Sequence, residues 1–217
     1  MSRSARVLAV AVGVAFGTAL IVYYIVSYLV VTPPLIASSG PAQANLTLQT
    51  VASLGFAPHA DWVSYLVKND QGKWVHSTVF HVPANTTVNV TVLQYDTATG
   101  LRNPFWGKPR GIVGGTINVD GKTLNVLNPD LASHTFAIPE LGVSVPLKGV
   151  GDNAKNQCST APCTLAEAHT TIKFSFRTGK PGKYRWQCFV PCAAAFPLGF
   201  GGPMQSLGYM DGYLMVG

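Results

Sequence analysis

Hydrophobic residues follow two different patterns along this chain. From Val7 to Val31 the sequence is apolar and has no charged residue. As a helix, these 25 residues would rise about 37 Å, enough to cross the ~30 Å hydrocarbon core of a bilayer with some tilt. Thr32-Pro33-Pro34 follows, and proline cannot continue a helix. The pattern predicts an N-terminal transmembrane signal anchor at residues 1–31, a linker at 32–44 and a folded domain at 45–217.

Within the predicted domain the apolar positions recur with the period of β-strands. Thr87 to Gln94 alternates valines with polar residues, as expected for a strand with one buried face. Ile117 to Leu124 predicts a type I′ hairpin around Asp-Gly, and Trp74 to Val82 is expected to form one strand. Short strands, Gly/Pro turns and the lack of a long amphipathic helix predict an all-β sandwich. Thr97 to Gly115 is expected to be an insertion packed over one end of it.

Composition narrows the function classes. Charged residues make up 11% of the chain and hydrophobic residues 47%, whereas an average soluble domain has roughly 25% charged residues. The net charge is +6, but no run of Lys or Arg is present, so nucleic-acid binding has little support. So few charges fit either an acidic external medium or an ordinary polar surface.

The charges that flank the apolar segment predict its orientation. Arg3 and Arg6 precede it and no basic residue follows closely, so the N-terminus is expected in the cytoplasm and the domain outside. The chain would then be a single-pass protein of the cell membrane. The alternative is a cleaved signal peptide, for which Ala42-Gln43-Ala44 resembles a cleavage site. The length of the apolar segment favours an uncleaved anchor.

Four cysteines then lie outside the cytoplasm, where disulfides persist. Cys158 and Cys163 are separated by four residues that include a proline, and we expect a disulfide between them. Cys188 and Cys192 leave two alternatives open: a second disulfide, or two thiolates that bind a metal. The chain is also expected to be a glycoprotein, because N-glycosylation motifs occur at Asn45, Asn85 and Asn89.

The strongest chemical signature is a set of potential copper ligands near the C-terminus. Pro181-Gly182-x-Tyr184-x-Trp186-x-Cys188 leads into Cys192 and later Met210, and Ser133-His134-Thr135-Phe136 lies upstream. Imidazole, thiolate and thioether groups suit copper. Together with Val82-Pro83-Ala84-Asn85, these motifs resemble cupredoxins over residues 74–217. The resemblance implies a Greek-key β-sandwich in which His134, Cys188, Cys192 and Met210 are the candidate metal ligands.

Cys188-x3-Cys192 further resembles the binuclear CuA motif in subunit II of haem-copper oxidases. That family supplies a second histidine and a methionine after the cysteine pair. A direct count puts Phe196 and Gly199 at these positions, whereas alignment on the final strand puts Leu207 and Met210 there. Either way the second histidine is missing, so the resemblance implies that a binuclear CuA centre does not form. One copper bound by the four candidate ligands stays open as an alternative.

These observations lead to three functional hypotheses. The first is a membrane-anchored, cupredoxin-like subunit of a respiratory terminal oxidase, which lacks CuA and stabilises a haem-copper catalytic subunit. Oxidases that take electrons from quinol have a similar subunit II without CuA. The second is a tethered mononuclear copper protein for electron transfer, and the third is a structural surface or filament β-sandwich. No nucleophile elbow, phosphate loop or haem-attachment motif is present, so the chain is not expected to be catalytic on its own.

Overall fold

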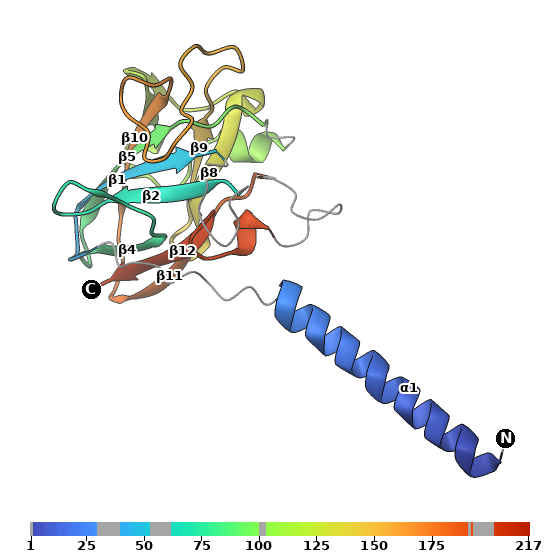
Figure 1. Ribbon diagram of the computed structural model, residues 1–217. Coiled ribbons are helices and arrows are strands. Elements are labelled where there is room, and N and C mark those ends of the chain that lie inside the picture. Colours follow the sequence, from blue (N-terminus) through green and yellow to red (C-terminus); the bar gives the residue numbers. More distant parts are fainter. Residues whose placement is uncertain (1, 30–39, 53–61, 100–102, 191, 193–201) are drawn as a thin grey trace. The chain divides into compact units, whose positions relative to one another are not determined.

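A computed structural model describes residues 2–29, 40–52, 62–99, 103–190, 192 and 202–217. The chain divides into two compact units, residues 1–33 and 34–217, and each is described by itself (Figure 1). Most of the predicted linker, together with Pro191, Phe196 and Gly199, lies outside the described residues.

The first unit is a single helix. Helix α1 spans Arg3–Tyr24 and continues as the π-helical turn η1, Ile25–Leu29. The Ser2 hydroxyl caps its start by accepting the Ala5 amide at 3.2 Å. Arg3–Ser27 is 25 residues long with a mean hydropathy of 2.2, so its length and composition fit a membrane anchor, as they would fit a signal sequence. The prediction of one N-terminal apolar helix is confirmed.

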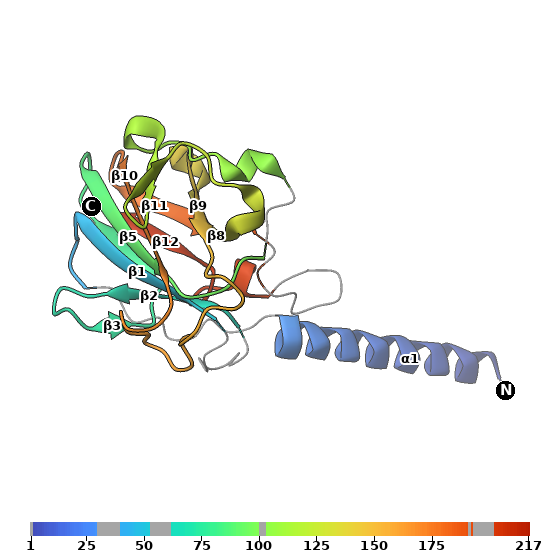
Figure 2. The ribbon, with the colours of Figure 1, turned by 90° about the horizontal axis from the view of Figure 1, so that it is seen from above.

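The second unit is a sandwich of two β-sheets that lie face to face (Figure 2). Among the described residues, sheet A has the strand order β3-β2-β1-β5-β10-β6-β7 and sheet B the order β4-β12-β11-β8-β9. The strands of sheet A are β1 Asn45–Val51, β2 Ser64–Lys68, β3 Trp74–Val75, β5 Thr87–Gln94, β6 Ile117–Val119, β7 Lys122–Leu124 and β10 Thr170–Arg177. The strands of sheet B are β4 Val79–Val82, β8 Ala132–Ile138, β9 Val143–Lys148, β11 Gly182–Gln187 and β12 Asp211–Val216. The predicted all-β sandwich with one N-terminal helix is confirmed.

Both sheets contain parallel as well as antiparallel strand pairs, because the chain crosses repeatedly from one sheet to the other. β1 runs parallel to β5, and β4 runs parallel to β12, whereas the other named pairs are antiparallel. Parallel neighbours cannot be joined by a tight hairpin. The strands between β1 and β5 therefore include β4, which belongs to the opposite sheet.

Short 3-10 turns occupy several of the connections. They are η2 Pro104–Gly107, η3 Val113–Gly115, η4 Pro129–Leu131, η5 Pro139–Leu141 and η6 Pro203–Gln205. The predicted insertion contains η2 and η3. Its Arg110 forms a β-bridge with Ser144 of β9, and the Trp106 ring stacks on Phe189 at 4.9 Å. The described part of this segment thus packs against the sandwich.

Trp186 is at the centre of the aromatic core between the sheets. Its ring stacks on Phe80 at 5.2 Å and on Phe136 at 5.5 Å, and Tyr65 meets it edge-on at 4.8 Å. All four side chains are fully buried. The indole N–H donates to the Thr78 carbonyl at 3.0 Å, so the ring is buried without an unsatisfied donor. This core supports the end of β11, from which the next residue, Cys188, enters the candidate site.

One predicted strand is wrong. Trp74 to Val82 was expected to be continuous, but it forms β3 in sheet A and β4 in sheet B. The chain turns between them at Ser77, whose hydroxyl accepts the Val79 amide at 3.2 Å. Apolar residues on the two sides of Ser77 belong to different sheets, which a hydrophobicity pattern cannot distinguish. The predicted hairpin is confirmed as β6–β7, since Asp120 and Gly121 both have positive φ, as a type I′ turn requires.

Candidate metal centre

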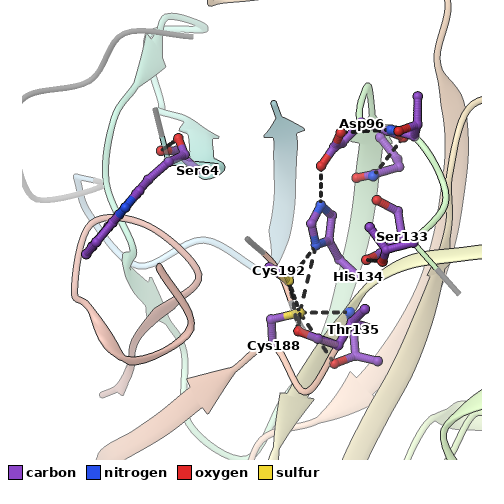
Figure 3. Close-up of polar contacts among 12 residues, drawn as sticks. Ser64, Asp96, Ser133, His134, Thr135, Cys188 and Cys192 are labelled. Carbon is purple, nitrogen blue, oxygen red and sulfur yellow. Dashed lines mark hydrogen bonds and ion pairs between the residues drawn. The ribbon is translucent and has the colours of Figure 1, made fainter. Parts of the chain in front are cut away.

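Residues far apart in the sequence meet at one site in the sandwich (Figure 3). His134 comes from β8, Cys188 follows β11, and Cys192 lies in the loop after it. The nitrogen and sulfur atoms that these three residues could offer to a metal all lie within 4.8 Å of one another. The predicted ligands His134, Cys188 and Cys192 are therefore brought together, and all three are buried.

A bulge in β8 helps to orient the histidine. Pairing with β9 shifts register between Ala132 and His134, and bulges commonly re-aim a side chain near a functional site. His134 Nδ1 then lies 2.9 Å from Cys192 Sγ and 3.9 Å from Cys188 Sγ. The two sulfur atoms are 3.0 Å apart and both cysteines are free. Imidazole and thiolates in this arrangement are the donors that copper prefers.

Asp96 fixes the other side of the imidazole. Its Oδ2 lies 3.0 Å from His134 Nε2, so Nε2 carries the proton and Nδ1 faces the thiols. A carboxylate on the outer nitrogen is the usual partner of a metal-binding histidine, because it fixes the tautomer and the ring orientation. Burial alone would raise the pKa of Asp96, but the hydrogen bond and charge of His134 and the Thr97 amide lower it overall.

Cys188 is the thiol that ionises more readily. Its sulfur accepts the Thr135 amide at 3.4 Å and lies 3.9 Å from the Thr135 hydroxyl. Burial raises the pKa of Cys188, but hydrogen bonds from Cys192 and His134, together with the His134 charge, bring it well below its ordinary value. Burial raises the pKa of Cys192, and the neighbouring Cys188 thiolate raises it further. The pair therefore shares one negative charge more easily than it carries two.

That charge also acts on the histidine. Burial lowers the pKa of His134, but Asp96 and the Cys188 thiolate more than offset this effect and raise it to about 9. Although Nδ1 is closer to Cys192, the stabilising charge is that of Cys188, since this thiol loses its proton first. Without metal the site is an Asp–His–thiolate chain of alternating charge, and a cation can replace the proton on Nδ1.

The loop after Cys188 supplies further donors. The Val190 carbonyl lies 3.0 Å from Cys192 Sγ, so its oxygen borders the site. Met204 Sδ accepts the Cys192 amide at 3.4 Å, so its thioether borders the site. Met210 is fully buried, and its carbonyl accepts the Cys188 amide at 2.9 Å. Met210 as a ligand stays a prediction, and Met204 joins it as a candidate.

The other histidines of the sequence are used differently where the structure describes them. His76 bonds to the Gly208 carbonyl, and His169 packs beside Tyr95. His59 lies outside the described residues. Only one imidazole is therefore found at the candidate centre among the described residues.

The other pair of cysteines forms a disulfide: Cys158 and Cys163 are joined on the outer face of sheet A.

Sequence reasoning missed Asp96. It is the second residue after the end of β5, between Tyr95 and Thr97, and no spacing or motif connects it with His134, 38 residues further on. The signal that could have found it is chemical. A strand histidine proposed as a metal ligand needs a partner for its outer nitrogen, and an acidic residue at a strand end is a candidate in a chain with so few carboxylates.

A scan against protein-family models gives no match, and a search of the curated proteins gives none. Several solved structures are similar to the chain, among them these three. Reduced auracyanin from the photosynthetic bacterium Roseiflexus castenholzii is 14% identical with a TM-score of 0.32, and the match covers 81% of this chain and 98% of that one. A chain of a heme-copper terminal oxidase dimer is 15% identical with a TM-score of 0.26, and the match covers 99% of this chain and 98% of that one. A multicopper oxidase is 10% identical with a TM-score of 0.29, and the match covers 80% of this chain and 43% of that one.

All three identities are below 25% and all three TM-scores are below 0.5. The description of the fold therefore rests on the strand order of the two sheets, and that of the candidate centre on the residue types gathered there.

Proposed function

We propose that the chain is a membrane-anchored electron-transfer protein that binds copper at His134, Cys188 and Cys192. The observation that carries this proposal is the convergence of one imidazole nitrogen and two free thiols in a fully buried position, with Asp96 on the outer nitrogen. A purely structural sandwich has no need of this arrangement, since a buried polar cluster lowers stability unless every member is satisfied. The thioethers of Met204 and Met210 lie beside this three-residue set and are further candidate donors.

The copper is held as a single ion. A binuclear CuA centre needs a terminal imidazole on each copper, and the described residues bring only His134 to the site. The undescribed residues 193–201 contain no histidine either. His134 and the thiolates supply enough donors to hold one copper ion.

Copper loading of the purified full-length protein tests this function. With its thiols kept reduced, it is expected to bind about one copper and to show an intense thiolate-to-copper absorption band. His134→Ala and Cys188→Ser should each abolish the band, whereas His169→Ala should leave it intact. A protein that takes up no copper, with Cys188 and Cys192 bonded to each other, would overturn the proposal. A seven-line electron paramagnetic resonance signal would instead identify a binuclear centre.

We further propose that the partner is a haem-copper oxidase catalytic subunit, for which the chain serves as a subunit II-like component. The support is the combination of one N-terminal apolar helix, a β-sandwich and a Cys-x3-Cys loop with a carbonyl next to its second thiol. Mild detergent extraction and affinity purification of the full chain should co-purify a haem-containing subunit. Recovery of the chain without haem would favour the free electron carrier.

A further inference from the structure

Tyr65 has a fully buried side chain whose hydroxyl finds no hydrogen-bond partner among the described residues. Leaving a hydroxyl buried and unpaired costs free energy, and such groups in native structures commonly bind an ordered water or another ligand. The edge-on contact with Trp186 uses the ring and leaves the hydroxyl unsatisfied. Tyr65 therefore indicates a position where something small and polar can bind.

The hydroxyl is not an isolated exception. Thr50 pairs in register with Tyr65 on one side and with Gln94 on the other. Thr50 Oγ1 and Gln94 Oε1 are also buried, and neither has a hydrogen-bond partner in the described part of the chain. All three residues share the inward face of sheet A, because each strand continues with core residues at alternate positions, such as Leu48, Val67 and Val92. A row of unsatisfied polar atoms in one part of the interior is typical of buried water.

This row lies at the metal-site end of the sandwich. The Tyr65 amide donates to the Tyr209 carbonyl, and the Cys188 amide donates to the carbonyl of the next residue, Met210. Tyr65 and Cys188 are thus attached to adjacent peptide groups. Gln94 in turn donates through Nε2 to the Asp96 carbonyl. The residues that carry the unpaired atoms therefore lie beside both ends of the Asp–His–thiolate chain: Tyr65 near Cys188, and Gln94 near Asp96.

The protonation state of Tyr65 fits the role of a hydrogen-bond donor. Burial raises the pKa of Tyr65 well above its ordinary value, and the charges of Cys188 and Cys192 raise it further. The phenol therefore stays protonated and can donate a hydrogen bond. Neither sulfur accepts that hydrogen bond directly, so the hydroxyl can donate to another acceptor.

We propose that Tyr65 holds one small exogenous ligand, a water molecule in the resting protein, at the coordination position that the missing second imidazole leaves open on the copper. The inference rests on the proposed copper site. It adds that this site is open to small hydrogen-bonding ligands, which a site closed by four protein ligands is not. The Tyr65 hydroxyl donates to the exogenous ligand and fixes its position.

Azide titration of the copper-loaded full-length protein tests this proposal, with azide as a small anion that can replace water. The wild-type protein should develop a new azide-to-copper band. Tyr65→Phe should bind copper equally well but bind azide about tenfold more weakly, a difference of about 1.4 kcal/mol. Tyr184→Phe is the matched control, because that hydroxyl donates to the Lys180 carbonyl and is expected to leave azide affinity unchanged.

A high-resolution crystal structure of the copper-loaded protein gives a second measurement. It should contain an ordered water within hydrogen-bonding distance of Tyr65 Oη that is missing in Tyr65→Phe. The proposal is overturned if copper binds but azide leaves its spectrum unchanged, or if Tyr65→Phe binds azide as tightly as wild type. Failure to bind copper at all would instead refute the proposed function, and metal analysis separates these outcomes.

Discussion

Asp96 illustrates how a single residue outside the predicted ligand set can control the candidate centre. Its carboxylate lies 3.0 Å from His134 Nε2 and is the only acidic partner of that ring among the described residues. Asp96→Asn keeps the shape but removes the charge that holds the imidazole in place. We expect copper affinity to fall about 10- to 100-fold, as measured by competition with a chelator. The exposed Asp152→Asn is the control, and equal affinities of the two variants would contradict this role.

The residues of the centre differ in how far the sequence reveals them. His134, Cys188 and Cys192 are recognisable because copper restricts the ligand types and because the cysteines keep a fixed spacing. Asp96 and Tyr65 act through contacts between segments that share no motif. Met204 and Met210 remain alternatives, since a thioether in a Gly- and Pro-rich loop can reach the site from more than one position.

At the scale of secondary structure, β12 is held against its neighbours by a glycine. A Cβ at Gly212 would overlap the Thr78 carbonyl oxygen and lie 2.7 Å from Trp186 Nε1. Gly212→Ala would therefore separate the strand from β4 and disturb the Trp186–Thr78 hydrogen bond. We expect a loss of about 3 kcal/mol in unfolding free energy, seen as a clear fall in melting temperature.

Gly151→Ala provides the matched control for this substitution. A Cβ there meets no atom within 4 Å, so the melting temperature should hardly change. Similar melting temperatures for the two variants would mean that β12 shifts without cost. The close approach at Gly212 explains why a strand glycine is required at this position, which is a packing constraint that the sequence alone does not display.

Individual strands were predictable where one face is buried and the turn chemistry is distinctive. β5 alternates valines with polar residues, and Asp120-Gly121 identifies the β6–β7 hairpin. β3 and β4 were merged because both are apolar and the connection at Ser77 lacks glycine and proline. Sheet membership depends on pairing between distant strands, such as β4 with β12, and hydrophobic periodicity contains no information about it.

At the scale of the whole molecule, the helix and the sandwich have opposite surface requirements. The side chains described in α1 are almost all exposed and apolar, which water would not tolerate but a lipid environment would satisfy. The sandwich buries its apolar side chains internally and contains a disulfide, as expected for a domain in an oxidising compartment. Together these features favour a membrane anchor attached to an extracytoplasmic domain.

We expect the N-terminus in the cytoplasm, because Arg3 and Arg6 precede the apolar segment. Protease added to intact cells should therefore digest the sandwich and leave a membrane-embedded fragment that contains Arg3–Ser27. A tag placed before Arg3 serves as the control, because it should resist digestion until the cells are opened. A sandwich that stays intact while the tag is removed would show the opposite orientation. A mature chain that begins just after Ala44 would show instead that the helix is a cleaved leader, and the copper centre would then belong to a soluble extracytoplasmic protein.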